Sequence, residues 1–456
     1  MRERAVLAIT KLAAAMCRLL GSGGQSLPGT IADRLDPQLL GRLSAKLPNG
    51  IILVTGTNGK TSTTKLIAAA LRSNGEQVLT NSTGANLRSG VTSALIGAAD
   101  LDGRIGATIG LFEVDEACLR LVAPEVRPRQ IVVLNLFRDQ LDRYGEVDTT
   151  AALLVEGIAA TDARVCLNAD DALVASLADS AADPGMATYF GIERLPSRPE
   201  TAPKAVTDSD RCPKCGTRLR FSRTFYSHLG HYACPRGDFS RPTPGVAVTS
   251  VEHTDPEGTD FTVTADGVPV KMRSGLSGTY NLYNAVAAVS VTTGLGLDPV
   301  VTGRALETTE AAFGRVEKVD VQGRTLWLLL IKNPTGFTQV LDTFLIGRRR
   351  PRVMMAVNDL AADGRDVSWL WDVPLEALAS TRPEVVTAGS RAQDMALRMH
   401  YAGTEVSVAA SFDDGIASLL TGLPPGGDAY ILPTYTAMLQ IRKVLGRLAP
   451  LQDAHA

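Results

Sequence analysis

The sequence predicts an α/β protein in which two successive series of strands and helices form separate sheets. Apolar strand-like runs alternate with helical stretches from residue 51 onward, the order expected of βα units with parallel strands. The first of these strands leads directly into a glycine-rich loop and then a helix. A second series begins beyond Gly314-Arg315, after a segment of different composition.

Composition limits the class of protein. A chain of 456 residues predicts roughly two to four domains, each able to bury its own core. Hydrophobic residues make up 45% and charged residues 21%, which is typical of a globular protein and not of a disordered chain. The 46 Lys and Arg balance 48 Asp and Glu, so no electrostatic footprint for nucleic acid is expected. Six Cys are too few for a disulfide scaffold of this size.

The N-terminal segment, 1–48, is expected to be helical, with an amphipathic helix over about 3–20. A signal peptide is the alternative, because an apolar stretch follows two arginines and ends at Cys17. Lys11 interrupts that stretch, and Met16 stands where cleavage needs a small residue. We therefore expect a cytoplasmic protein with reduced thiols. No run approaches about 18 uncharged apolar residues, so no transmembrane helix is expected.

The central domain is expected over 49–312, with an inserted module at about 205–245 that is rich in Pro, Arg, Ser and Cys. Its expected elements are strands at 51–54, 77–79, 107–113, 130–135 and 164–167, antiparallel strands within 246–273, and helices at 62–73 and 280–294. The C-terminal domain is expected over 313–456 as a Rossmann-like α/β fold, with strands at 326–331, 352–357, 384–387 and 429–432.

The loop after the first strand has the composition of a phosphate-binding loop. Its expected nucleotide-binding residues are Gly56, Thr57, Asn58, Gly59, Lys60 and Thr61. A strand, a glycine-rich turn and a helix present backbone N–H groups to an anion. Lys60 would reach the β- and γ-phosphates, and Thr61 would hold Mg²⁺ through its hydroxyl. The loop departs from the generic G-x-x-x-x-G-K-[ST] pattern at Thr55. The alternative, a chance glycine-rich turn, does not explain the strand before it and the helix after it.

The T-G-T-N-G-K-T form resembles the Mur ligase superfamily, which includes folylpolyglutamate synthases and joins carboxylates to amines at the expense of ATP. The resemblance extends to Asn135–Gly145, with Gln140 in place of a His, and to Asn168-Ala-Asp-Asp171. It implies a second Mg²⁺ ligand at Glu113 and further ATP-binding residues at Asn281, Asn284 and Arg315. The stretch Leu330–Gly336 departs from the family pattern, so that part of the nucleotide site is not carried over.

Three of the cysteines have the spacing of a zinc ribbon. A C-x-x-C knuckle supplies two of the four ligands that Zn²⁺ takes in a tetrahedron. The second knuckle supplies one, because Arg236 and Gly237 occupy the places where a fourth Cys would fall. We expect structural Zn²⁺ on Cys212, Cys215 and Cys234, with His228, His231 or Asp238 as candidates for the fourth ligand. A cysteine turn that persists without metal is the alternative.

The segment Asn358–Asp372 contains four Asp and two of the three Trp, directly after an apolar strand. Sites in open α/β sheets lie at this end of a strand. A capped, turn-rich loop is the alternative. Together with the phosphate loop and the Cys-rich insertion, the segment resembles the MurT family, the synthetase subunits of lipid II isoglutaminyl synthases.

The resemblance implies amidation of the D-glutamate α-carboxylate of lipid II to D-isoglutamine, through an acyl phosphate, at the inner face of the cell membrane. It also implies a glutamine amidotransferase partner, GatD, whose Cys and His form a triad with Asp366. The catalytic residues would then be Lys60, Glu113 and Asp366. Two alternatives remain, namely a Mur or folylpolyglutamate synthase-type ligase that acts without a partner, and a non-catalytic ATP-binding scaffold. The helix at 3–20 would pack on the ligase core or, less favoured, lie on the membrane.

Overall fold

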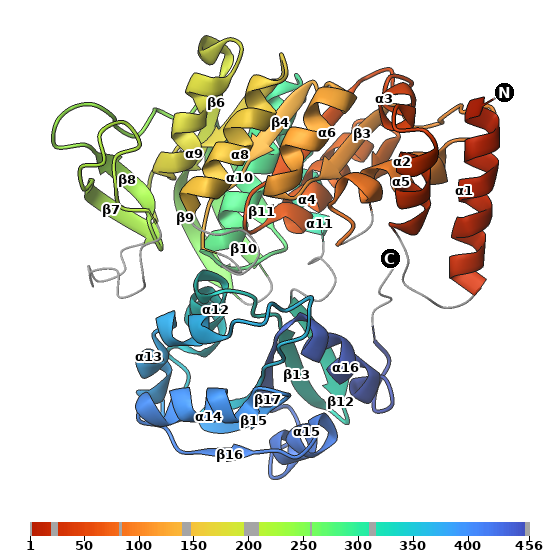
Figure 1. Cartoon of the computed structure of the whole chain (residues 1–456). Coiled ribbons are helices and arrows are strands. Elements are labelled where there is room, and N and C mark those ends of the chain that lie inside the picture. Colours follow the sequence, from red (N-terminus) through yellow and green to blue (C-terminus); the bar gives the residue numbers. More distant parts are fainter. Residues whose placement is uncertain are drawn as a thin grey trace. The chain divides into compact units, whose positions relative to one another are not determined.

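The computed structural model describes residues 2–19, 26–81, 84–138, 147–195, 209–255, 258–309 and 316–451. The chain divides into two compact units, which are described separately (Figure 1). The first unit comprises Met1–Phe137, Glu146–Pro199 and Asp208–Thr309, and the second comprises Arg138–Gly145, Glu200–Thr207 and Glu310–Ala456. The predicted boundary at 312–313 lies outside the described residues. Within the described parts, no helix is long and apolar enough to cross a membrane.

The first unit is built on a nine-stranded sheet with the order β11-β10-β9-β6-β5-β4-β1-β3-β2. Its strands are β1 (Ile51–Thr55), β2 (Val78–Thr80), β3 (Ile109–Glu113), β4 (Gln130–Val133), β5 (Arg164–Asn168), β6 (Thr188–Ile192), β9 (Val246–Asp255), β10 (Gly258–Ala265) and β11 (Val268–Ser274). Neighbours from β2 to β9 are parallel, and β9, β10 and β11 are antiparallel. The predicted parallel sheet is therefore confirmed, and the antiparallel strands extend the same sheet.

Helices cover this sheet, which explains why β1, β3 and β4 are wholly buried. The helices are α1 (Arg2–Leu19), α2 (Leu27–Leu35), α3 (Leu39–Ser44), α4 (Lys60–Ser73), α5 (Arg88–Ala98), α6 (Leu119–Val126), α8 (Val147–Ala159), α9 (Ala172–Ser176), α10 (Thr279–Gly294) and α11 (Pro299–Thr308). Leu7 of α1 and Leu39 of α3 share one apolar cluster with Leu53 of β1. The helices of the 1–48 segment thus bury one face in the same core as the sheet.

The Cys-rich insertion forms a two-stranded sheet of β7 (Arg220–Tyr226) and β8 (Leu229–Ala233) (Figure 1). Buried polar contacts fasten it to the turn after β5. Arg241 Nε donates to Asp170 Oδ1 over 2.6 Å, and the hydroxyl of Tyr283 in α10 donates to Asp170 Oδ2 over 2.8 Å. Burial raises the pKa of the fully buried Asp170 carboxyl, and Arg241 opposes that shift.

The second unit contains a six-stranded sheet with the order β12-β13-β17-β14-β15-β16, parallel except for β12 against β13. Its strands are β12 (Val316–Val321), β13 (Arg324–Leu329), β14 (Arg352–Ala356), β15 (Glu384–Ala388), β16 (Val406–Val408) and β17 (Asp428–Pro433). Its helices include α12 (Pro334–Val340), α13 (Leu375–Ala379), α14 (Ala392–Tyr401), α15 (Phe412–Leu420) and α16 (Tyr435–Leu445). Successive side chains of β14 point to opposite faces of the sheet, and both faces are covered. Met354 and Met355 therefore lie in two different apolar clusters. The predicted second α/β sheet is confirmed.

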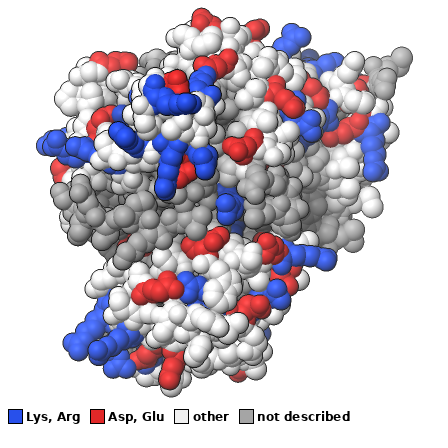
Figure 2. All heavy atoms as spheres, turned by 60° about the vertical axis from the view of Figure 1, so that its left-hand side comes forward, with Lys and Arg blue, Asp and Glu red and all other residues white. Residues whose placement is uncertain are grey.

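The face of the molecule in Figure 2 shows Lys and Arg interspersed with Asp and Glu on both units. This mixed surface agrees with the balanced composition of the chain.

We expect Arg241→Ala to lower the free energy of unfolding of the first unit by about 3–5 kcal/mol, because it leaves Asp170 buried beside no cation. Arg218→Ala in the same module is the matched control. The Arg218 side chain is 79% exposed, so its ion pair with Asp210 should contribute about 1 kcal/mol at most. Urea unfolding followed by circular dichroism measures both. Equal losses in the two variants would contradict the role given to Arg241.

Candidate functional site

The loop between β1 and α4 needs glycine at two positions. Gly56 and Gly59 have φ angles of 127° and 91°, in the left-handed region that other residues rarely adopt. A Cβ atom on Gly59 would also clash with Oδ1 of Asn284 in α10. The backbone is therefore held tightly against α10 at the start of α4.

Helix α4 begins at Lys60 without a side-chain cap. The backbone N–H groups of its first turn have no partner within the helix, and the helix dipole adds partial positive charge there. A strand, a tight glycine turn and an uncapped helix start together form a site suited to an anion.

Asn135, two residues after the end of β4, holds the loop in place. Its backbone oxygen accepts from the Thr57 N–H over 3.0 Å, and its side chain both accepts from the Asn58 N–H (2.9 Å) and donates to the Asn58 carbonyl (3.0 Å). The Thr57 hydroxyl in turn contacts the backbone of Phe137. Asn135 begins the segment 135–145 that resembles the Mur ligase superfamily, and no role was predicted for it from the sequence. The signal for that role was its position after β4, the strand beside β1.

The Lys60 side chain is buried and already paired. Its ammonium donates to the carbonyl of Gly56 over 2.5 Å and lies 3.2 and 3.3 Å from the two carboxylate oxygens of Glu116. Glu116 was not among the residues predicted from the sequence. This pair holds the cation beside the phosphate loop.

Glu113 and Thr61, the two expected Mg²⁺ ligands, are hydrogen-bonded to each other. Glu113 ends β3 and is the register partner of Val54 in β1, so its side chain lies beside the loop that follows β1. The Thr61 hydroxyl donates to Glu113 Oε2 over 2.8 Å. A hydroxyl and a carboxylate oxygen are ligands that suit Mg²⁺, so this pair fits the expected ion.

The structure also brings Asn281 and Asn284 to the loop. Asn284 Oδ1 accepts from the Thr63 hydroxyl over 3.2 Å, and Asn284 Nδ2 donates to Asn281 Oδ1 over 3.0 Å. Their amides thereby hold the start of α10 against the start of α4. Arg315 and the residues 139–145 lie outside the described residues.

The three cysteines of the insertion converge. The sulfur atoms of Cys212, Cys215 and Cys234 all lie within 4.8 Å of one another. Asp238 Oδ2 lies 3.9 Å from the Cys234 sulfur. Three thiols with a neighbouring carboxylate are a donor set that fits Zn²⁺.

Two candidates for the fourth zinc ligand have other partners in the structure. His228 Nε2 lies 3.4 Å from Asp171 Oδ2 and is fully buried at the turn after β5. His231 Nε2 lies 2.9 Å from the carbonyl oxygen of Ile192 at the end of β6. The cluster of metal-ligating groups found among the described residues contains the three cysteines, and His228, His231 and Asp238 all lie outside it. The two His side chains contact the main sheet instead.

In the second unit, the loops after β14, β15 and β17 meet at the carboxyl edge of the sheet. The Asn358 side chain accepts from the Ser390 N–H over 3.0 Å, and its backbone N–H donates to the Thr434 hydroxyl over 3.0 Å. Asp363, which is buried, accepts from the Thr436 N–H over 2.8 Å. Side-chain contacts thus fix the loop that carries Asp366.

Asp366 is exposed on this fixed loop. Its Oδ1 accepts from the Ser368 N–H over 2.8 Å, and contacts with Ser368 lower the pKa of the carboxyl. Buried Val367 and Leu370 anchor the residues that follow. The result is an ionised carboxylate held at the surface by rigid backbone.

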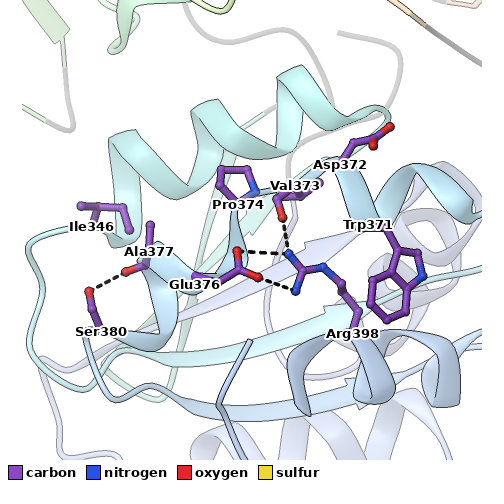
Figure 3. Close-up of a pocket in the computed structure, with 9 residues that line it drawn as sticks. All are labelled: Ile346, Trp371, Asp372, Val373, Pro374, Glu376, Ala377, Ser380 and Arg398. Carbon is purple, nitrogen blue, oxygen red and sulfur yellow. Dashed lines mark hydrogen bonds and ion pairs between the residues drawn. The ribbon is translucent and has the colours of Figure 1, made fainter. Parts of the chain in front are cut away.

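The two Trp of the segment have different surroundings. Trp369 packs edge-on against Phe337, with ring centroids 6.4 Å apart, whereas Trp371 is 48% exposed. Trp371 borders a pocket of about 740 Å³ in which Arg398 is held by Glu376 (2.9 Å) and by the Val373 carbonyl (2.6 Å) (Figure 3). The charges of Arg398 and Glu376 in this pocket are therefore paired with each other.

Comparisons with known proteins match segments of both units. The description "Mur ligase middle domain" matches residues 54–203, and "MurT ligase C-terminal" matches residues 330–438. The chain is 31% identical to the MurT subunit of the lipid II isoglutaminyl synthase (glutamine-hydrolyzing) of Staphylococcus aureus (strain COL), over 98% of each protein. It is 32% identical to the same subunit of Streptococcus pneumoniae (strain ATCC BAA-255 / R6), over 92% of each. Among solved structures, a pseudomurein peptide ligase type C from Methanothermus fervidus has a TM-score of 0.70 at 21% identity, over 89% of this chain and 80% of that one.

Proposed function

The chain belongs to the MurT family of Mur-type ligases, and we propose that it amidates the D-glutamate α-carboxylate of lipid II to D-isoglutamine as the synthetase subunit of a lipid II isoglutaminyl synthase. The observation that carries this proposal is the similarity to two MurT subunits over nearly the whole chain. The uncapped start of α4, with Lys60, Thr61 and Glu113 around it, supports it from the chemistry of the site.

The chemistry requires activation of the substrate. A carboxylate resists nucleophiles because it is negatively charged and oxide is a poor leaving group. One carboxylate oxygen attacks the γ-phosphorus of ATP, ADP leaves, and an acyl phosphate forms. Ammonia then attacks the carbonyl carbon, phosphate leaves with that oxygen, and the nitrogen loses a proton to give the amide.

The first unit would bind the nucleotide. The N–H groups at the start of α4 would bind phosphate oxygens. The Lys60 ammonium would leave the Glu116 carboxylate and bind phosphate oxygens in its place. Thr61 and Glu113 would hold Mg²⁺, which when bound offsets charge on the transferring phosphoryl group. Since the Lys60 ammonium is already oriented by Gly56 and Glu116, little side-chain entropy is lost when phosphate arrives.

The second unit would complete the supply of ammonia. A GatD-type glutaminase would release ammonia from glutamine, with Asp366 fixing the tautomer of the partner's His. The lowered pKa of Asp366 keeps the carboxylate ionised, as this role requires. Its exposure leaves it accessible to a partner's imidazole. Action at the inner face of the cell membrane follows from the lipid-linked substrate.

We extend the proposal to structural Zn²⁺ held by Cys212, Cys215 and Cys234, with Asp238 as the fourth ligand. Asp238 is the remaining candidate beside the cysteines once both His side chains are assigned to docking. The ion would cross-link two turns of a module whose own apolar cluster is small.

Replacing Lys60 tests the phosphate site. Lys60→Ala should reduce ATP-dependent amidation of lipid II at least about 100-fold, with glutamine or with an ammonium salt as nitrogen donor, because charge on the phosphoryl group is no longer offset. Lys65→Ala, on the same helix, is the control. Product formation is measured by mass spectrometry. Amidation by the Lys60→Ala variant that persists with the ammonium salt would refute the role of Lys60.

Asp366→Asn separates the two half-reactions. Glutamine-dependent amidation by the reconstituted pair should fall by about 10⁴-fold, the scale of losing a triad carboxylate, while ammonium-dependent amidation stays unchanged. Asp372→Asn in the same segment is the control. Near-normal glutamine turnover in the Asp366 variant would rule out the triad assignment. Loss of the ammonium-dependent reaction would show that the variant acts through folding.

Zinc is tested by elemental analysis of the purified chain. We expect about one Zn²⁺ per chain, a loss of metal in Cys212→Ser, and weaker zinc retention against a chelator in Asp238→Asn, because one of four ligands is removed. Asp210→Asn in the same module should retain zinc like the unmodified chain. A zinc content near zero in the unmodified chain would overturn the site, and equal retention in both Asp variants would exclude Asp238.

A further inference from the structure

One face of helix α1 packs against the rest of the first unit. Val6, Leu7 and Thr10 are buried against the first unit. Glu3 points the same way, with its carboxylate 3.1 Å from Arg42 Nε and 2.6 Å from Lys46 Nζ. These contacts fix the rotation of the helix about its axis, and so they fix which residues face outward.

The outward face of α1 is apolar. Ile9, Leu12 and Met16 are 50%, 65% and 54% exposed, and the neighbouring Ala5 and Ala8 are exposed as well. Spacings of three and four residues align these five positions in one stripe along the helix. Amphipathic helices of globular proteins turn such a stripe toward the core, whereas α1 presents this one to the surface while a different face is buried.

Basic residues flank the stripe. Arg4 is exposed and Lys11 is half-buried, and their separation of seven residues places them on one row beside the apolar positions. In sequence, α1 carries four basic residues, Arg2, Arg4, Lys11 and Arg18, against one acidic residue, Glu3. Glu3 is turned inward, and Asp102 on a neighbouring loop lies 3.7 Å from Arg4.

We propose that this outward face, comprising Ala5, Ala8, Ile9, Leu12 and Met16, lies in the interfacial region of a membrane containing anionic lipids. The apolar side chains enter the acyl boundary, and Arg4 and Lys11 lie at the level of the phosphates. The choice of a bilayer as occupant rests on the charge complementarity of the flank and on the proposed function, whose substrate is attached to a lipid. Burying one face of α1 in the ligase core ties the catalytic unit to the surface that holds its substrate.

The binding is expected to be modest and sensitive to charge. Each basic residue near an anionic surface strengthens binding roughly fivefold, and salt weakens the attraction within a Debye length. A short helix with three large apolar residues therefore gives a reversible contact that lets the enzyme move between substrate molecules.

The test measures binding of the full chain to vesicles by co-sedimentation. Vesicles of phosphatidylcholine mixed with phosphatidylglycerol should bind the chain more tightly than phosphatidylcholine alone. The variant Ile9→Ser/Leu12→Ser/Met16→Ser should bind the mixed vesicles at least about tenfold more weakly. The matched control replaces three residues of similar exposure elsewhere in the first unit, Leu121→Ser/Val155→Ser/Met186→Ser, and should bind unchanged.

A second arm isolates the charge. Lys11→Glu should weaken binding to the mixed vesicles more than tenfold, since it both removes and reverses a charge, and should reduce the dependence on salt. Lys65→Glu on α4 is the control. Equal binding of the unmodified chain and the triple-serine variant would overturn the proposal.

Two readouts separate this proposal from other outcomes. Sedimentation velocity tests whether the stripe covers a second copy of the chain, and a dimer that the triple-serine variant abolishes would replace the membrane assignment. Amidation of a water-soluble muropeptide should be unchanged by the serine substitutions, while amidation of lipid II in vesicles should fall with binding. If the unmodified complex amidates neither substrate, the proposed function fails, whatever the vesicles show.

Discussion

The first unit depends on keeping the start of α4 open while holding its backbone rigid. A capped helix would satisfy its own N–H groups and lose its affinity for phosphate. The loop is instead held from outside, by Asn135 after β4 and by Asn284 on α10. Left-handed glycines permit that close approach, so loop, neighbouring strand and distant helix form one arrangement.

The same helix α10 links the phosphate loop to the Cys-rich module. Tyr283 lies one residue before Asn284, and its hydroxyl donates to Asp170, which also accepts from Arg241 of the module. The Asp171 carboxylate contacts the His228 side chain of the module and accepts a hydrogen bond from the Leu136 N–H in the loop after β4. Two adjacent carboxylates thus connect the insertion to both elements that hold the phosphate loop. Burying them is costly, and the cost is offset because each has several partners.

Apolar runs in the sequence predicted β1, β3, β4, β5, β14, β15 and β17, but not β6, β12 or β16. Thr61 was predicted from the loop motif and Glu113 from the family resemblance, and the two side chains are hydrogen-bonded. A buried parallel strand reads as an apolar run, and the end of such a run marks the edge where sites form. The contacts that sequence analysis missed join residues far apart in the chain. Lys60 meets Glu116 and Asp171 meets His228 only after folding, and no local pattern indicates either pair. The two His looked like metal ligands because spacing alone cannot show that they face the sheet.

In the proposed function, Asp366 is a group that this chain holds ready for use by a partner protein. A carboxylate that must accept from a partner's imidazole cannot be neutralised by its own chain, yet it must be held still. Here backbone supplies both conditions. The Ser368 N–H holds one carboxylate oxygen and favours the ionised form, and buried Val367 and Leu370 restrain the turn. Asp363 nearby stabilises the loop, since it is buried and accepts a hydrogen bond from the Thr436 N–H. Asp359 and Asp363 therefore hold the loop through Ser390 and Thr436, and Asp366 would present its charge to the partner.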